Sequence, residues 1–456
     1  MDQHHGLAQP QTTSTITGVG CASLPFDMLS KVFFDCLPDG GFPGFSRKEA
    51  PLLLCRVCRH WRTVALASHL LWAKLTIRKH SNGTIVTTPS LAIGVWISRA
   101  GQCTLSFRFV NFEFSFEERI GIITSILPYR KRWEHLEGHL IGQQWLTIRS
   151  AISEGAPLLQ YIDISLPPFE NNDPEMRLSA TPVLRSLILH SHHNILGLEA
   201  CTRTLQLLSV YVRNLDECLS YLVHCPSLKF AKLKGNFPVT SPTPEGFRTL
   251  EMQQILTLKL HVSFAGPLLD RLHSPVLESL CFGSLDAGFV VSSFISRCSP
   301  PLATLIIFDS AENFSSNDLL DCLRCCPSLT FLIVRNRMWL GNTDMDQLQL
   351  GSERDKNICP RLEQIYLSCC GRGNMSHVED MVLSRWKGAD DVVSSASLDC
   401  TSAQSYRWER NLRQISLDTC DFEDYSSNQS IYFIKRPKIA KCIEEGLFIL
   451  EEPPWR

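Results

Sequence analysis

The sequence lacks the features of several large protein classes. Its apolar runs, of which residues 50–55 are among the longest, stay far below the roughly 18 residues that a membrane span needs. The first twenty residues contain no apolar run typical of a signal peptide. The formal net charge is only −2, so no overall field favours nucleic acid or anionic lipid as a partner. We therefore expect a cytoplasmic or nuclear protein.

Catalytic signatures are absent as well. The sequence contains no G-x-S-x-G, H-E-x-x-H, Walker-type or dinucleotide-binding glycine motif, so nothing in it predicts a catalytic residue. The cluster His190-x-His192-His193 has the look of a set of metal ligands. No acidic or thiol residue stands at ligand spacing beside it, and we therefore expect a solvated loop there.

Cysteine is frequent, but not in the pattern of a small secreted domain. The 19 cysteines in 456 residues fall short of the roughly 8–10% typical of a disulfide scaffold. Cys55-x-x-Cys58 has the spacing of half a zinc site, but the nearest similar pair, Cys322-x-x-Cys325, lies far away in the sequence. Cys55 and Cys58 also fall on a predicted apolar helix face, where free cysteine acts as a small hydrophobe. The sequence thus predicts reduced, metal-free thiols and no cofactor.

The sequence contains enough apolar residues to form a large core, since 44% of its residues are hydrophobic and 20% are charged. A polar stretch at residues 1–21 predicts a disordered leader. Apolar residues then recur every three or four positions over residues 23–37, which predicts a helix. A second helix is expected to start at Pro51, followed by a third apolar cluster at residues 70–75. The apolar face of the second helix is expected to contain Leu54, Val57, Cys58, Trp61 and Ala65.

Beyond residue 100 the spacing changes to a longer repeat. The template L-x-x-L-x-L, with apolar replacements, starts at Leu159, Leu184, Leu205, Leu228, Ile255, Leu277, Leu302, Leu329, Leu362 and Leu412. The steps between these starts are 25, 21, 23, 27, 22, 25, 27, 33 and 50 residues. Seven of the nine steps fall within the roughly 20–29 residues of a leucine-rich repeat, in which a strand alternates with a helix.

A second recurring pattern marks the junctions between repeats. Cys-Pro-Ser-Leu occurs at residues 225–228 and 326–329, and Cys-Pro-Arg-Leu at 359–362. An apolar run typical of a helix precedes the first two, so the proline indicates a helix end just before the next strand. Residues 85–150 are expected to hold degenerate first repeats, and residues 387–408 a surface insertion.

These patterns predict an α+β fold, more closely an α/β solenoid, preceded by three helices. The expected parts are a leader at 1–21, a helical module at 22–80, repeats at 85–420 and a C-terminal cap or tail at 421–456. Three short helices form only a small core, so the module is expected to bury surplus apolar surface against a neighbour or a partner.

The helical module resembles a known family. Leu24-Pro25-Phe26-Asp27-Met28-Leu29, followed by Val32-Phe33 and Leu37, is similar to the opening of the F-box, L-P-x-E-I-L-x-x-I-F-x-x-L. Val57-Cys58-Arg59-His60-Trp61-Arg62 and Leu71-Trp72-x-x-Leu75 are similar to its V-C-x-x-W-R and L-W-x-x-L blocks. Asp27 replaces the usual Glu, and the loop at 39–49 is longer than in short F-boxes. The whole chain resembles fungal (basidiomycete-type) F-box proteins with divergent leucine-rich repeats.

The resemblance implies a substrate receptor of an SCF-type cullin–RING ubiquitin ligase that is not itself an enzyme. In that family the F-box docks on a Skp-type adaptor, and the repeats hold the protein whose ubiquitination leads to proteasomal degradation. The resemblance assigns to the adaptor face Leu24, Pro25, Leu29, Val32, Phe33 and Leu37, together with Leu53, Leu54 and Val57 from the second helix.

The repeat pattern also predicts where a target protein binds. In L-x-x-L-x-L the leucines point into the solenoid, and the residues between them point to its concave face. These outward positions combine a basic patch with an exposed apolar band, which suits an acidic or phosphorylated segment with a hydrophobic residue nearby. The predicted target-binding residues are Lys232, Lys234, Lys259, His261, Ile306, Phe308, Ile333 and Tyr366, with Tyr211 beside them.

Two other functions stay open on the sequence alone. One is a scaffold or inhibitor whose repeats bind a partner without an adaptor and without any role in ubiquitin transfer. The other is a hydrolase or transferase activity within an insertion such as residues 387–408. Neither nucleic acid nor a membrane is an expected partner.

Overall fold

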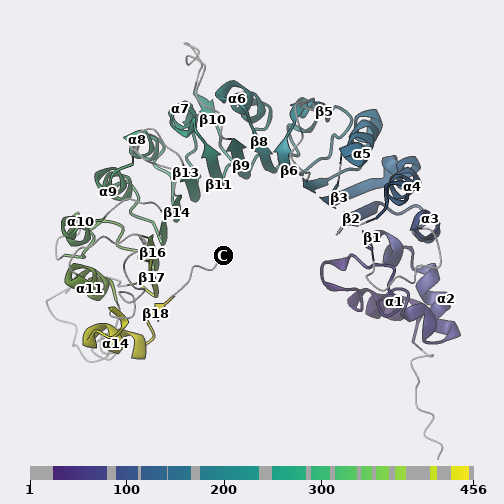
Figure 1. Ribbon diagram of the computed structural model, residues 1–456, viewed down its shortest axis with the longest axis horizontal. Helices are drawn as coiled ribbons and strands as arrows, with labels where there is room; N and C mark the ends of the chain where they lie inside the picture. Colours follow the sequence, from purple (N-terminus) through teal and green to yellow (C-terminus); the bar gives the residue numbers. More distant parts are fainter. Residues whose placement is uncertain are drawn as a thin grey trace, which may run out of the picture. The chain divides into compact units, whose positions relative to one another are not determined.

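The computed structural model describes the chain at residues 24–79, 89–110, 114–140, 142–165, 175–235, 249–283, 289–308, 314–335, 340–351, 356–368, 375–386, 411–418 and 433–450. These residues form helices and strands (Figure 1) that belong to two compact units, residues 1–135 and 136–456. The predicted mixed class is confirmed as helices with a large parallel sheet. The expected leader at 1–21 and the insertion at 387–408 lie outside the described residues.

The first unit opens with short helical segments. They are α1 (Phe26–Asp35), η2 (Asp39–Gly41), η3 (Leu54–Arg56), α2 (Arg59–Ala67) and η4 (His69–Trp72). The helix predicted over residues 23–37 is thus present as α1. It begins directly after Pro25, whose carbonyl accepts a hydrogen bond from the backbone N–H of Leu29 at 3.0 Å. Because proline has no N–H, no unpaired donor is left at this position.

These helices close around a small aromatic core. The rings of Phe33 and Trp61 lie 5.0 Å apart, and the indole N–H of Trp72 donates to the carbonyl of Ala65 at 2.8 Å. Leu29, Phe33 and Trp72 are at most 1% exposed. The side chains that fill this core are fully enclosed, and apolar residues on the outside of the helices are surplus to it.

The second helix differs from the prediction. Instead of one helix from Pro51, the chain forms the short turn η3 and then starts α2 at Arg59. Cys58 precedes α2 with an extended backbone (φ −156°), and its sulfur accepts a hydrogen bond from the Trp61 N–H at 3.4 Å. A residue that caps a helix leaves helical geometry. Cys58 is consequently exposed, and the prediction that it lies on an apolar helix face is wrong.

Further elements extend the first unit beyond the helices. They are β1 (Lys74–Ile77), α3 (Pro89–Arg99), β2 (Leu105–Phe109), α4 (Phe116–Ile126), η5 (Leu127–Arg132) and the start of β3 (Trp133–His139), which runs across the unit boundary. β1 and β2 are parallel. The rings of Trp72 and Trp96 lie 4.8 Å apart, and the indole N–H of Trp96 donates to the carbonyl of Lys74 at 3.2 Å. The helices and the first strands therefore share one core.

The long loop after α1 belongs to that core too. Phe42 is buried, and its carbonyl accepts a hydrogen bond from the Thr76 hydroxyl at 2.9 Å. The Thr76 N–H donates to the carbonyl of Pro43 at 2.7 Å, so the loop follows β1. The Arg108 guanidinium lies 4.2 Å from the centre of the Phe42 ring. The extra length between the first two helices is therefore used in packing.

The second unit is built on parallel strands that neighbour one another in chain order. They are β4 (Tyr161–Ser165), β6 (Ser186–His192), β8 (Leu207–Tyr211), β9 (Phe230–Gly235), β11 (Thr257–Val262), β13 (Ser279–Gly283), β14 (Thr304–Ile307), β15 (Phe331–Val334), β16 (Gln364–Ser368), β17 (Gln414–Asp418) and β18 (Phe448–Ile449). Those from β4 to β17 coincide with the ten L-x-x-L-x-L matches, so the strand prediction is confirmed.

Equivalent positions of the repeat align from strand to strand. Leu258 of β11 lies between Ala231 of β9 and Leu280 of β13, and all three side chains are fully buried. Side chains alternate between the two faces of a strand. The apolar positions therefore share one face of the sheet, and the residues between them share the other.

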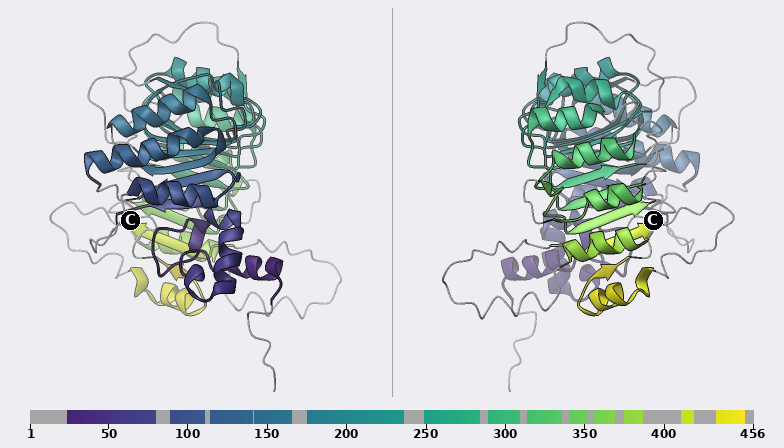
Figure 2. Two further views of the ribbon diagram at one scale, coloured as in Figure 1. Left: turned by 90° about the vertical axis from the view of Figure 1, so that its right-hand side faces the viewer. Right: turned by 90° about the vertical axis from the view of Figure 1, so that its left-hand side faces the viewer.

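Helices and small strands connect the main strands. They are α5 (Gly142–Gly155), β5 (Glu175–Arg177), β7 (Asn194–Leu196), η6 (Leu198–Cys201), α6 (Leu215–His224), β10 (Leu250–Glu251), α7 (Ala265–Arg271), β12 (Leu272–His273), α8 (Phe289–Cys298), α9 (Ser316–Arg324), α10 (Asn342–Gln347), α11 (Met375–Arg385) and α14 (Pro437–Glu444). In the second unit the helices lie on one side of the sheet (Figure 1), and α8 to α11 stack in chain order (Figure 2, right). Among the described residues, no helix covers the other face of these strands.

The predicted junctions recur as a common turn. After α6, the Leu228 N–H donates to the carbonyl of Cys225 at 3.2 Å, and Leu329 donates to Cys326 in the same way after α9. Within the expected C-terminal segment at 421–456, residues 433–450 form α14 and β18 and so continue the alternation. β18 pairs in parallel with β17.

Candidate functional site

The outer side of α1 carries an apolar stripe, which we define as Leu24, Met28 and Val32. Met28 and Val32 are four positions apart and lie on one face of α1, and Leu24 lies just before the first turn of that helix. Their exposed fractions are 37%, 57% and 44%, and Phe26 beside them is 46% exposed. Large apolar side chains that are grouped in this way on a surface usually indicate a site of protein contact.

A second apolar pair lies on the segment that leads into α2. Leu53 and Val57 are also four residues apart, and they are 43% and 53% exposed. Leu54, between them, turns inward and is 3% exposed. The module thus presents two apolar groups around a core that is already closed.

The structure separates the residues assigned to the adaptor face into three groups. Those that are exposed are Leu24, Pro25, Val32, Leu53 and Val57. Leu37 is half-buried, whereas Leu29, Phe33 and Leu54 are buried in the core of the module. Buried side chains hold the surface in shape but cannot touch a partner, so these three are left out of the proposed contact face.

Two exposed apolar residues of α1 were not predicted as contacts. Phe26 and Met28 stand at positions where the F-box pattern has a variable residue or an isoleucine, and the motif alone does not distinguish an inner from an outer position. The signal that identifies Met28 is its spacing of four from Leu24 and from Val32.

In the second unit, the face without helices carries the residues predicted to hold a target. The pairing places Ser209, Lys232, Lys259, Cys281, Ile306, Ile333, Tyr366 and Ser416 in one row across the strands. A second row contains Tyr211, Lys234 and His261. The strand pairing therefore confirms that these positions are neighbours, whereas their binding of a target remains a prediction.

Three lysines on adjacent strands, Lys232, Lys234 and Lys259, form what we call the lysine face. Among the described residues, no ion pair joins any of the three to a carboxylate. Burial lowers the pKa of Lys232, and the charges of Lys234 and Lys259 lower it further. This face therefore holds positive charge that the described part of the chain does not neutralise, and an anion placed there would relieve the repulsion.

Aromatic rings flank the lysine face. The Lys234 ammonium lies 5.3 Å from the centre of the Tyr211 ring, and that of Lys259 lies 5.5 Å from the centre of the Phe230 ring. Phe230 was not predicted, although its period-two spacing from Lys232 identifies it. These contacts place the ammonium groups beside aromatic rings, and no carboxylate among the described residues pairs with them.

A stacked pair of rings closes one end of the face. The rings of His261 and Phe308 lie 5.2 Å apart and are inclined by only 29°. Phe308 follows Ile307, the partner of Phe282, and His261 is the partner of Gly283. The stack thus spans β13 at a glycine, where no side chain separates the rings. Burial and the three nearby lysines lower the pKa of His261, so its ring is neutral at pH 7.

The predicted exposed apolar band is only partly present. Ile306 and Phe308 are half-buried. Ile333 and Tyr366 are 2% and 5% exposed, so the prediction that they form an open band is wrong. Neighbouring strands are only about 4.8 Å apart, and side chains in one row cover each other. Large residues in the middle of a row therefore lose their exposure even without a helix above them.

The histidine cluster also differs from the prediction of a solvated loop. His190 and His192 belong to β6, and His193 is 1% exposed. Nε2 of His193 lies 2.8 Å from the indole Nε1 of Trp145, and Nε2 of His192 lies 3.2 Å from Oε1 of Glu217. These partners are 48 and 25 residues away in the sequence, so local spacing could not reveal them. The two histidines act as packing and hydrogen-bonding groups of the first repeats.

Comparison with known proteins adds no family, because no protein-family model matches the sequence and no curated protein is significantly similar to it. Within the part of the chain that the structure describes, no group of three or more His, Cys, Asp or Glu residues is arranged to hold a metal ion. No helix in that part is long and apolar enough to cross a membrane.

Proposed function

We propose that the chain is the substrate-receptor subunit of an SCF-type cullin–RING ubiquitin ligase. In this proposal the N-terminal module is an F-box that docks on a Skp-type adaptor, and the second unit is a leucine-rich-repeat solenoid that binds the target protein. The chain itself catalyses nothing, because the thioester chemistry of ubiquitin transfer belongs to other subunits.

The observation that carries the proposal is the apolar stripe over a closed core. Leu29 and Phe33 already fill the interior of the module, yet Met28 and Val32 remain in solvent one position away on the same helix, and Leu24 is exposed just before it. Burying an apolar side chain of this size on binding is worth roughly 1.5–3 kcal/mol. A helix face of this kind fits a hydrophobic groove on a partner.

The lysine face supports the other half of the proposal. A target segment that carries carboxylates or phosphates would meet three cations, and a hydrophobic residue next to them would meet Phe308 and the exposed part of Ile306. Because the rings and stems are already packed against each other, little side-chain freedom is lost when the segment binds.

Copurification with a Skp-type adaptor tests the docking half. Met28→Asp with Val32→Asp places two charges on the apolar stripe without touching Leu29 or Phe33. The matched control is Leu91→Asp with Val95→Asp, an exposed apolar pair at the same spacing on α3, with exposed fractions of 66% and 51%.

We expect the stripe variant to lose the adaptor by more than about tenfold, since each disrupted anchor costs on the order of 2 kcal/mol. The control should retain it. If the wild-type chain fails to bind any Skp-type adaptor, the function as an adaptor-independent scaffold is favoured instead. If the stripe variant and the control behave alike, the docking face lies elsewhere.

A further inference from the structure

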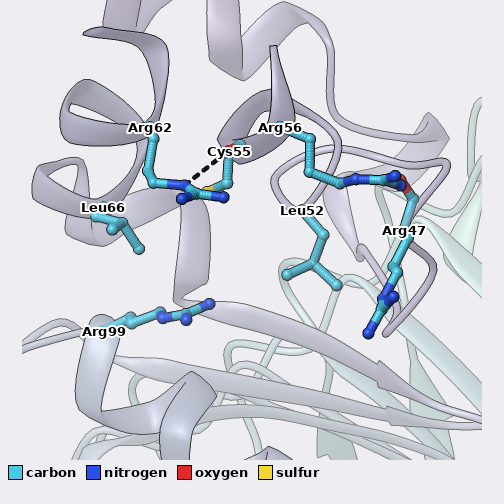
Figure 3. Close-up of a pocket in the computed structure, with 7 residues that line it drawn as sticks. All are labelled: Arg47, Leu52, Cys55, Arg56, Arg62, Leu66 and Arg99. Atoms are coloured by element: carbon cyan, nitrogen blue, oxygen red, sulfur yellow. Dashed lines mark hydrogen bonds between the residues drawn. The ribbon is translucent and has the colours of Figure 1, made fainter. Parts of the chain in front are cut away.

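A hollow in the first unit gathers arginines from four separate segments. Arg47 comes from the loop after α1, Arg56 from η3, Arg62 from α2, and Arg99 from the end of α3 (Figure 3). Leu52, Cys55 and Leu66 complete the lining, and no Asp or Glu takes part in it. The cavity has a volume of about 490 Å³, which lies within the roughly 300–1,000 Å³ of small-molecule sites.

The guanidinium groups are not neutralised by the described part of the chain. Among the described residues, no ion pair joins Arg47, Arg56, Arg62 or Arg99 to a carboxylate. Arginine keeps its charge at any pH a protein meets, so the cavity carries four positive charges in a chain whose net charge is −2. Such a concentration of one sign attracts anions from solution.

Three of the four side chains are held in place. The Nε–H of Arg62 donates to the carbonyl of Cys55 at 2.8 Å, which is the bond drawn in Figure 3. The Arg99 guanidinium lies 4.5 Å from the centre of the Trp72 ring, and Arg56 donates to the carbonyl of Arg47 at 3.4 Å. These contacts use only some of the N–H groups of each guanidinium, and the others remain available to a ligand.

We propose that this cavity binds a small soluble molecule that carries two or more phosphate groups. Planar guanidinium forks match the oxygens of phosphate in pairs, and the four positive charges exceed the roughly −2 charge of a single phosphate group. Leu52 and Leu66 offer an apolar patch to the carbon part of such a molecule. The site is distinct from the apolar stripe and from the lysine face, and it does not depend on the proposed function.

Titration calorimetry of the full chain with inorganic tripolyphosphate tests the site. The variant is Arg47→Gln with Arg56→Gln, whose exposed side chains contribute little to the core. The matched control is Lys48→Gln with Arg59→Gln, which removes the same charge from neighbouring exposed positions that do not line the cavity.

We expect saturable binding to the wild-type chain that weakens as salt is raised. The Arg47/Arg56 variant should bind at least about tenfold more weakly, because it loses two charged hydrogen-bond donors of the site. The control should stay within about twofold, as expected for charges that act only at long range.

Three results would overturn the proposal. The first is the absence of saturable binding to the wild-type chain. The second is an equal loss in the variant and the control, which would mean a general charge effect. The third is tripolyphosphate binding that is the same in the wild-type chain and the Arg47/Arg56 variant, which would place the binding site elsewhere.

Discussion

The ring of Phe33 lies 5.0 Å from the ring of Trp61 and inclined to it by 58°. This contact joins α1 to α2, the two segments whose sequences resemble the opening and closing blocks of the F-box. Phe33 is fully buried, while Met28 on the same helix is 57% exposed. Phe33 therefore belongs to the core that stabilises the module, and Met28 to the surface that is available to a partner.

Replacing Phe33 with alanine should lower the stability of the chain strongly, whereas replacing Met28 should hardly change it. Phe33→Ala is expected to lower the free energy of unfolding by about 3–5 kcal/mol, because it opens a cavity in the core. Met28→Ala should change it by less than about 0.5 kcal/mol, as surface substitutions usually do. Urea denaturation followed by tryptophan fluorescence measures both. Similar losses in the two variants would contradict the separation of core and surface.

Arg385 is predicted to be essential to the stability of the later repeats. It is 1% exposed and donates to the carbonyls of Leu348, Ile358 and Cys359 at 2.7–2.8 Å. Burial lowers its pKa to about 10, which still leaves it charged at neutral pH. Arg385→Met removes all three hydrogen bonds, and among the described residues only the carbonyl of Cys359 keeps another donor, the Leu362 N–H at 3.3 Å, so the change should cost about 3 kcal/mol or more.

Arg413→Met is the control for that substitution. The Arg413 side chain is 76% exposed and lies 3.7 Å from a Glu363 carboxylate oxygen. An exposed pair of this kind contributes little stability. Thermal melts should therefore show a clear loss for Arg385→Met and almost none for Arg413→Met. Equal melting temperatures would mean that the buried guanidinium is not holding the turns together.

Glu217 makes stability depend on acid pH. Burial raises the pKa of its carboxyl, but hydrogen bonds from His192, the Arg213 N–H and Tyr221 outweigh burial and bring the pKa down to about 2. A carboxylate with a depressed pKa stabilises the fold above its ordinary pKa of about 4.5, and this contribution is lost as pH falls toward 2.

Glu217→Gln should therefore be about 2 kcal/mol less stable than the wild-type chain at pH 7. The difference should shrink between pH 5 and pH 3, as the wild-type carboxyl begins to lose its advantage. Denaturant midpoints at these pH values measure it. A difference that stays constant over this range would show that the carboxylate charge is not the source of the stabilisation.

The thiols should divide into reactive and protected groups. Among the described cysteines, Cys36 and Cys58 are exposed, whereas burial raises the pKa of Cys225 to about 12 and that of Cys281 to about 11. A buried thiol with a raised pKa forms little of the reactive thiolate. Cys36→Ser with Cys58→Ser should lower the number of thiols that react with a disulfide reagent in the folded chain by two. The matched change Cys225→Ser with Cys281→Ser should leave that number unchanged.

Much of the fold could be predicted from the sequence because it depends on local periodicity. Leu258 is a typical example: it is buried, as are Ile255 and Leu260, and the spacing of these three residues in the sequence predicts the strand. The row formed by Lys232, Lys259 and Ile306 then follows from aligning the repeats.

The remaining features depend on contacts that spacing does not encode. The burial of Ile333 and Tyr366 depends on neighbours across strands, and that of His193 depends on Trp145. The first unit extends past residue 80 because Trp96 packs on Trp72. The break at Cys58 arises because a capping contact competes with helix continuation, which the apolar pattern does not register.

The most direct test of the central claim is a paired measurement on one set of cells with the proteasome inhibited. Affinity purification and mass spectrometry would compare the wild-type chain, Met28→Asp with Val32→Asp, and Lys232→Glu with Lys234→Glu. The control for charge reversal is Lys229→Glu with Arg203→Glu, at exposed positions outside the lysine face. The account predicts that the Met28/Val32 variant loses the Skp-type adaptor and keeps the target, that the Lys232/Lys234 variant keeps the adaptor and loses the target, and that the control keeps both. Loss of both partners from either variant, or of neither from both, would contradict a receptor with two separate binding surfaces.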